Sequence, residues 1–201
     1  MTHEKVPSVK RGELRQTNRM GEETIEKIIQ AAKELLIEDG PIRFTLDRVA
    51  KKADIKKGTL LYHFPTKDAL CLVLMRRYVR HLDRHFRAGV QEAQNFNSQD
   101  PNVTAFIEWY RAFHEEKPTY TSLGLHLLAL AANNDTMRRP LENWYQDRFQ
   151  ELRNSPIGSQ DAIQIVLALE GLFFLRHFHI HALSNEEISR LLTRLTVRAE
   201  K

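Results

Sequence analysis

The chain has 201 residues, a formal net charge of +4 and 42% hydrophobic residues, with 8 Gly and 7 Pro. This length suits one core of ordinary size or two small ones, and the few Gly and Pro argue against a loop-rich all-β fold. Cys71 has no second cysteine for an internal disulfide, the N-terminus lacks the apolar segment of a secretion signal, and no apolar run is long enough to cross a bilayer. We therefore expect a soluble, cytoplasmic protein without a membrane segment.

Positive charge is concentrated in the N-terminal part of the chain. Residues 1–87 contain 19 Lys and Arg against 12 Asp and Glu, whereas residues 88–201 contain 11 against 14. This distribution is expected when the first part neutralises phosphates and the remainder has a different task. Charge by itself favours the simpler interpretation of solvated Lys-rich helix faces, so the motifs have to decide between the two interpretations.

An arm and an amphipathic helix open the chain. Residues 1–19 are polar and predict a flexible basic arm whose Lys and Arg side chains can follow a DNA backbone or groove. The next helix is expected over roughly 22–38 and should end at Gly40-Pro41. Its apolar stripe consists of Ile25, Ile28, Ile29, Ala32, Leu35 and Leu36.

Two short helices joined by a tight turn follow. The first opens at Thr45, a good N-cap residue, and carries one apolar face up to Ala53. After a joint at residues 53–55, the second runs from Gly58 to Phe64, with Leu60 and Phe64 packing inward. Two helices connected in this way, with donors on the outer face of the second, fit a major groove. The pattern predicts a DNA-binding helix-turn-helix.

The same stretch resembles the tetracycline-repressor (TetR) family, whose fingerprint is Gly-x-Leu-Tyr-x-His-Phe-x-x-Lys. The residues that match it in register are Gly58, Leu60, His63, Phe64 and Lys67. The chain departs from the pattern at Leu61, which occupies the usual Tyr position and is followed by Tyr62. Asp54 stands where the family often has Gly, and Asp tolerates the left-handed conformation better than most residues. The resemblance covers about residues 22–80.

The resemblance implies phosphate contacts from Thr45, His63 and Lys67, and we expect Lys57 and Tyr62 to face the groove. The full set of candidate DNA-contacting residues is Thr45, Arg48, Lys56, Lys57, Gly58, Thr59, Leu61, Tyr62, His63 and Lys67.

The remaining pattern is helical throughout. Thr66 should cap a long helix to about residue 90, and a linker rich in turn residues follows over 95–102. Five more helices are then predicted, over about 103–117, 120–132, 137–152, 160–183 and 186–198. The expected fold is all-α with about nine helices: a DNA-binding domain over 20–80 and a helical effector-binding and dimerisation domain over 81–201.

The helix expected at 160–183 is apolar on all sides over 162–175, where Gln164 and Glu170 are its polar residues. Such a helix is buried all round, and so small a body can cover it fully only with another subunit. A central core helix in a monomer is the alternative. The resemblance implies that the last two helices form a four-helix dimer interface, for which Leu167, Phe178, Leu191 and Leu195 are the candidates.

Aromatic residues of the second region suggest a cavity for a small molecule between helices. Without the resemblance, simple filling of the core would be the preferred interpretation. Because the resemblance implies an inducer pocket here, we expect an apolar or aromatic effector. The candidate ligand-binding residues are Trp109, Tyr110, Phe113, His126, Trp144, Phe174 and His177.

Catalytic and metal sites are not expected. On a helix only His177 and His181 of the His177, His179 and His181 group share a face, and no carboxylate or Cys completes a ligand set. Cys71 lies among apolar residues and should be packed rather than nucleophilic. We expect no enzyme activity, no cofactor and no metal, but a ligand-responsive repressor that binds a palindromic operator as a homodimer. The alternative is a constitutive DNA-binding or architectural protein whose second domain only dimerises or docks a protein partner.

Overall fold

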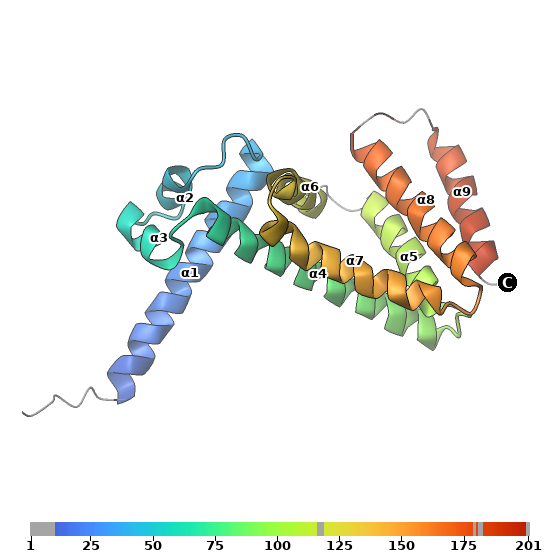
Figure 1. The fold of residues 1–201 in the computed structure, drawn as a ribbon, viewed down its shortest axis with the longest axis horizontal. Helices are drawn as coiled ribbons and strands as arrows, with labels where there is room; N and C mark the ends of the chain where they lie inside the picture. Colours follow the sequence, from blue (N-terminus) through green and yellow to red (C-terminus); the bar gives the residue numbers. More distant parts are fainter. Residues whose placement is uncertain (1–10, 116–118, 179, 181–182, 200–201) are drawn as a thin grey trace, which may run out of the picture.

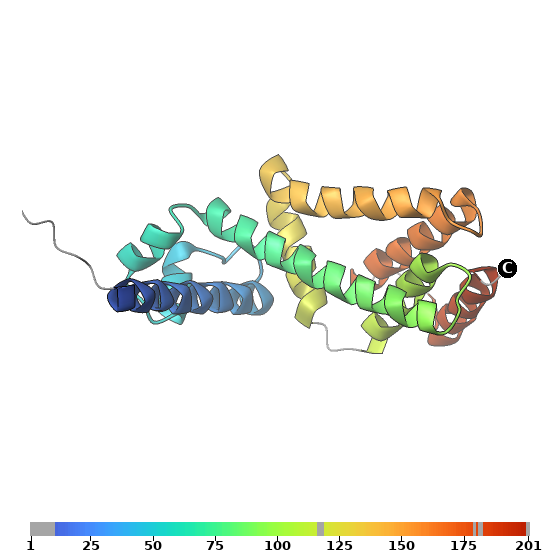
Figure 2. The same cartoon turned by 90° about the horizontal axis from the view of Figure 1, so that it is seen from below.

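The computed structural model describes residues 11–115, 119–178, 180 and 183–199. Within these ranges it contains nine helices and no strand, which confirms the all-α prediction (Figure 1). Helices α1 to α3 form a head at one end of an elongated molecule, and α5 to α9 form a larger body. Helix α4 runs from the head into the body and belongs to both (Figure 2).

The head consists of α1 (Arg11–Asp39), α2 (Leu46–Lys52) and α3 (Lys57–His63). Helix α1 begins at Arg11, so residues 11–19, expected within a flexible arm, are helical. The segment contains no Pro, and each residue added to an existing helix forms another backbone hydrogen bond, so the helix extends past the last apolar position. Residues 1–10 of the expected arm lie outside the described residues. At its other end α1 stops before Gly40, as predicted, where φ is +72°.

Helix α4 (Lys67–Asn95) is the long spine of the molecule. It begins where the sequence predicted, because the Thr66 hydroxyl accepts a hydrogen bond from the Ala69 backbone N–H at 3.1 Å. The helix contacts α1 in the head and α5, α6 and α7 in the body. Its buried stripe, which includes Leu70, Leu74 and Phe86, therefore faces both parts in turn.

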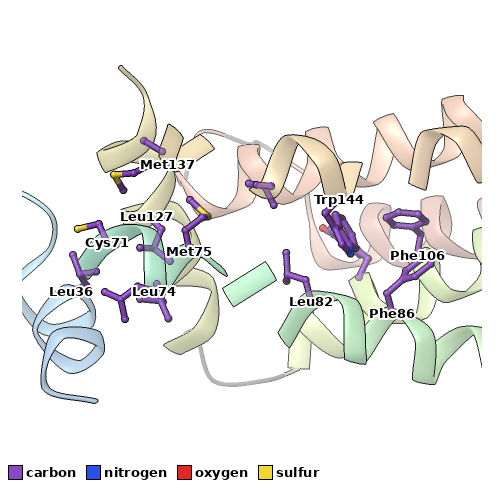
Figure 3. Close-up of a cluster of buried hydrophobic side chains, with 14 of the residues drawn as sticks. Leu36, Cys71, Leu74, Met75, Leu82, Phe86, Phe106, Leu127, Met137 and Trp144 are labelled. Atoms are coloured by element: carbon purple, nitrogen blue, oxygen red, sulfur yellow. The ribbon is translucent and has the colours of Figure 1, made fainter. Parts of the chain in front are cut away.

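A single hydrophobic core extends through head and body (Figure 3). Where the two parts meet, Leu36 of α1 lies near Cys71 and Leu74 of α4, and Leu127 of the body lies on the other side. Farther into the body the same core continues through Phe86, whose ring centroid lies 6.0 Å from that of Trp144. Apolar packing thus crosses the boundary that the sequence suggested near residue 80.

The body comprises α5 (Pro101–Glu115), α6 (Thr119–Ala131), α7 (Asp135–Arg153), α8 (Ser159–His177) and α9 (Asn185–Ala199). Helix α6 contacts α1, so the body touches the head directly as well as through α4. Helices α8 and α9 lie at the end of the molecule far from the head (Figure 1).

Helix α8 is shorter than predicted and ends at His177 instead of residue 183. The Ile180 backbone N–H turns back to the Leu175 carbonyl at 3.0 Å, a bond spanning five residues that closes the helix end. The sequence carries no Gly or Pro at this point, and an all-round apolar stretch has no periodicity whose loss would mark the end. Among the helices of the described ranges, none combines the length and apolarity needed to cross a membrane.

Candidate functional site

The joint between α2 and α3 is closed by a left-handed residue. Asp54 has φ +53°, and the Ile55 N–H donates to the Ala50 carbonyl at 3.0 Å while the Asp54 N–H donates to the Lys51 carbonyl at 3.3 Å. This pair of bonds is the Schellman arrangement that ends a helix with one residue in the left-handed region. The turn predicted at Asp54 is therefore formed, and it fixes the angle at which α3 leaves α2.

Helix α3 divides its side chains between the core and solvent. Leu60 is fully buried and Phe64, just after the helix, is nearly so, as predicted. Tyr62 is 83% exposed and Leu61 is also at the surface. The remaining predicted positions on this side, Lys56, Lys57, Gly58 and Thr59, are exposed as well. An apolar anchor behind an outward-facing polar surface is the arrangement a reading helix needs.

Two of the cationic residues predicted to contact DNA form ion pairs within the head. Arg48 pairs with Asp39 of α1 at 2.6 Å, and Lys57 pairs with Asp47 of α2 at 2.8 Å. Both pairs are substantially exposed, and pairs of this kind are worth about 0–1 kcal/mol. A DNA phosphate can therefore compete with either carboxylate at little cost.

The three residues expected to hold phosphates occupy different environments. The Thr45 hydroxyl caps α2 by accepting a hydrogen bond from the Arg48 backbone N–H at 3.4 Å. The His63 ring is half-buried, 5.1 Å from the Tyr62 ring. The Lys67 ammonium lies over the Phe44 ring, 5.4 Å from its centroid. Thr45 thus has a structural role in the free protein, and Lys67 is oriented by packing.

A cavity lined by aromatic rings lies inside the body. Side chains from α4, α5, α6, α7 and α8 enclose a space of about 60 Å³. A single water molecule needs about 10–15 Å³ on this scale, so the cavity admits several waters or a small ligand. Its aromatic lining consists of Tyr78, Phe106, Trp109, Tyr110, Tyr145, Phe173 and Phe174.

One carboxylate faces this apolar space. Glu170 of α8 accepts a hydrogen bond from the Tyr145 hydroxyl at 2.9 Å. Burial raises the pKa of Glu170, and the Tyr145 hydrogen bond only partly opposes this shift. Burial and the nearby Glu170 carboxylate raise the pKa of both Tyr78 and Tyr145, so their hydroxyls remain protonated donors. Desolvation makes an unpaired negative charge costly here, and a bound cation would offset that cost.

The cavity includes some of the residues predicted from sequence and not others. Trp109, Tyr110 and Phe174 line it. Trp144 does not line the cavity. It is buried in the core, where its ring centroid lies 6.2 Å from that of Trp109. His177 stacks on Phe173 at 6.4 Å, outside the lining. The Phe113 side chain lies outside the described part of the structure.

His126 also lies away from the cavity, at the junction of head and body. It projects from α6 toward the turn after α1, where a Cβ added to Gly40 would sit 3.7 Å from its Nε2 atom. The prediction of His126 as a cavity residue was wrong because α6 turns one face toward the cavity and another toward the head.

Glu170, Tyr78 and Gly124 also line the cavity, although none of them was predicted to do so. Glu170 was noted only as an interruption of an apolar run, although a lone carboxylate in such a run is a usable signal. Tyr78 and Gly124 meet across the cavity wall, where a Cβ added to Gly124 would lie 2.2 Å from the Tyr78 hydroxyl oxygen. No local pattern predicts that contact, because the two residues are on different helices.

The described residues include no cluster of three or more His, Cys, Asp or Glu side chains suited to a metal ion. His179 and His181, considered above as ligands, lie outside the described residues. Cys71 is buried, and its burial raises the pKa of the thiol to about 12, so it stays protonated and unreactive at neutral pH.

A helix-turn-helix with an exposed reading helix, joined to a helical body, defines a DNA-binding protein of the helix-turn-helix class. Residues 28–74 match the family described as "Bacterial regulatory proteins, tetR family", and residues 103–200 match "Tetracyclin repressor-like, C-terminal domain". The chain belongs to the TetR family. Its relatives are named as transcriptional regulators rather than enzymes, in agreement with the sequence analysis.

The HTH-type transcriptional regulator EthR of Mycobacterium tuberculosis is 38% identical over 104 residues. The EthR protein of Mycobacterium bovis matches to the same extent. The aligned segment is 51% of this chain and 48% of the relative, so the chain spans about half the length of the curated relatives it matches.

Solved structures share the fold over most of the chain. SCO1917 of Streptomyces coelicolor, a member of the TetR family, superposes with a TM-score of 0.68 at 21% identity, covering 86% of this chain and 98% of that one. The multidrug binding protein EbrR complexed with ethidium gives 0.65 at 23% identity, with coverages of 86% and 98%. Identities this low establish the fold alone.

Proposed function

We propose that the protein is a ligand-responsive transcriptional repressor that binds a palindromic operator as a homodimer and is released by a small molecule. The observation that carries the proposal is the position of the cavity on α4 and α6, the two body helices that also contact α1 of the head. A ligand that shifts either helix acts on an element shared with the DNA-binding surface. Such a ligand lowers operator affinity by favouring a conformer whose two reading helices no longer match successive major grooves.

A short path connects the cavity with the head. Leu125 and Leu128 of α6 line the cavity, while His126 on the same helix faces Gly40 at the end of α1. Tyr78 lines the cavity from α4, adjacent to Arg77, which pairs with Glu26 of α1. Because packed cores move between discrete arrangements, displacement of α6 or Tyr78 is transmitted to α1.

The lining favours an aromatic ligand that carries a positive charge. Aromatic faces attract cations, and Glu170 supplies a buried counter-charge. EbrR, which shares the fold, has been solved with ethidium and with proflavin, both aromatic and cationic. The chemistry of this cavity is thus consistent with what that protein binds.

Dimerisation is supported by an apolar face that the single chain leaves uncovered. On α8, Leu167 is 55% exposed, Phe174 and Leu175 are partly exposed, and Phe178 after the helix is 57% exposed. These residues lie on one side of the helix, and large exposed apolar faces mark interfaces. Of the two α9 candidates, Leu191 is half-buried and Leu195 is buried in the chain's own core, so the apolar contact with a partner falls mainly on α8.

The interface is tested by placing a charge on that face. Leu167→Asp should give monomers in sedimentation velocity and a steep loss of operator binding, because each monomer reads only half a palindrome. Ile42→Asp is the control for the sedimentation measurement, since Ile42 is 94% exposed in the head, far along the chain from α8. A Leu167→Asp protein that remains dimeric would place the interface elsewhere.

Ligand response is tested with benzyltrimethylammonium and its uncharged carbon analogue, neopentylbenzene. Quenching of Trp109 fluorescence should report binding. Glu170→Gln should lower the affinity for the cation at least tenfold and leave the affinity for the neutral analogue nearly unchanged, which corresponds to about 1.4 kcal/mol of selectivity. DNA selected by the protein from a random pool then serves as operator. By linkage, the ligand must weaken DNA binding by the factor by which DNA weakens ligand binding.

The alternative function, constitutive DNA binding, makes the opposite prediction for the same measurements. A compound that quenches Trp fluorescence equally well with and without operator would indicate a cavity with no regulatory coupling. The body would then serve only to dimerise or to dock a protein partner.

A further inference from the structure

We infer that the groove between α1 and α4, beside the head, is a second ligand site that takes a small multivalent anion of the oligophosphate type. The groove is distinct from the aromatic cavity, and Leu123 of α6 is part of its lining. It encloses about 550 Å³ and opens to solvent. Its walls therefore come from the head, the spine helix and the body together.

A row of nitrogen-bearing side chains follows the α4 wall. Arg77, Arg80, His81 and Arg84 all line the groove and recur at the three- and four-residue spacing that places side chains on one helix face. From Arg77 to Arg84 the row is about 10 Å long, given the rise of an α-helix. Lys33 faces the row from α1.

The acidic residues of the groove neutralise only part of this row. Glu26 forms a bidentate ion pair with Arg77. Asp83 forms ion pairs with Arg87 and, at 3.3 Å, with Arg148. Within the described part of the chain, Arg80 and Arg84 form neither an ion pair nor a hydrogen bond to an acidic side chain. Among the described residues, Arg80 and Arg84 therefore leave the groove with an excess of positive charge.

His81 lies in the middle of the row and is partly buried. Burial, followed by the nearby His85, Arg84 and Lys33, lowers the pKa of His81 to about 4. The imidazole is therefore neutral at pH 7. An anion bound in the groove would raise the pKa of His81.

The geometry favours a ligand with several phosphate groups over a single carboxylate. Guanidinium groups bind phosphate oxygens in bidentate fashion, and a row of this length lets successive groups engage Arg80 and Arg84 in turn. A ligand that also reaches Lys33 would link α1 to α4. Since Tyr78 lines both this groove and the aromatic cavity, occupancy of one site should alter affinity at the other.

Calorimetric titration of the DNA-free protein with inorganic tripolyphosphate tests the site. We expect one site per chain and affinity reduced at least tenfold in Arg84→Ala and in Arg80→Ala. Arg139→Ala is the control for lost net charge, because Arg139 is exposed on α7 and does not line the groove. Equal losses in Arg84→Ala and Arg139→Ala, or no loss in either groove variant, would refute the site.

A second arm distinguishes a free oligophosphate from the DNA backbone as the source of phosphate. If the groove takes the free anion, Arg84→Ala should leave operator affinity and its salt dependence unchanged when no tripolyphosphate is present. If Arg84→Ala instead weakens operator binding and flattens its salt dependence while tripolyphosphate binding is retained, the groove contacts DNA and the inference is wrong. Both arms are independent of the aromatic cavity and of its ligand.

Discussion

Replacing Gly124 by Ala should destabilise the protein by forcing Tyr78 out of its position. A Cβ at residue 124 would lie 2.2 Å from the Tyr78 Oη and 2.5 Å from its Cζ, whereas ordinary contacts begin near 3.4 Å. Tyr78 must therefore move by about 1 Å or more, and overpacking of this kind costs about 1–3 kcal/mol. Alanine in a helix interior recovers about 1 kcal/mol relative to glycine, so the expected net loss is at most about 2 kcal/mol.

The clash and the helix preference can be separated in a double-mutant cycle with Tyr78→Ala. In that background the obstructing ring is absent, so Gly124→Ala should change sign and stabilise the protein by up to about 1 kcal/mol. Urea unfolding at one fixed protein concentration, with unchanged m-values, measures all four corners of the cycle. Stabilisation by Gly124→Ala in both backgrounds would show that Tyr78 does not approach Gly124 closely.

Three further predictions concern single residues. Burial raises the pKa of Glu170 above its usual 4.5, so the stability of the wild-type protein falls as the pH rises above 4.5. Relative to the wild type, Glu170→Gln should therefore be equally stable below pH 4.5 and progressively more stable toward pH 7. Identical urea midpoints of the two proteins at pH 7 would contradict this. Thr66→Ala should cost about 1 kcal/mol of unfolding free energy through loss of the α4 cap, while Thr66→Ser should cost little. Asp54→Val should cost about 1–2 kcal/mol because of the positive φ, whereas Asp54→Gly should be tolerated, and equal melting temperatures for the two would disprove the strain.

The fold was largely predictable because it depends on local signals. The apolar stripe ending at Gly40, the caps at Thr45 and Thr66, and the inward pair Leu60 and Phe64 all act within a few residues of the chain. Prediction failed where such signals are missing. The end of α8 lacks any breaking residue, and the extension of α1 to Arg11 adds turns beyond its last apolar position.

The candidate sites likewise differ in whether local sequence signals determine them. The helix-turn-helix surface is encoded within about twenty consecutive residues, and its exposed positions agree with the pattern. The cavity instead depends on which face each of five helices turns inward, so a composition-based choice placed His126 and Trp144 there and omitted Glu170. The anion groove could not be recognised either, because Lys33 and Arg84 are brought together only by the crossing of α1 and α4.

The uninterrupted core between head and body limits how freely the protein can be divided or recombined. Leu36 and Leu74 are covered in part by Leu127, so a fragment cut near residue 80 would expose apolar surface that α6 normally shields. A chimaera that joins this head to the body of a distant relative would face the same mismatch unless the side chains facing Leu36 were exchanged as well. The packing of α6 against the head therefore limits which sequence changes the DNA-binding head can accept without matching changes in α6.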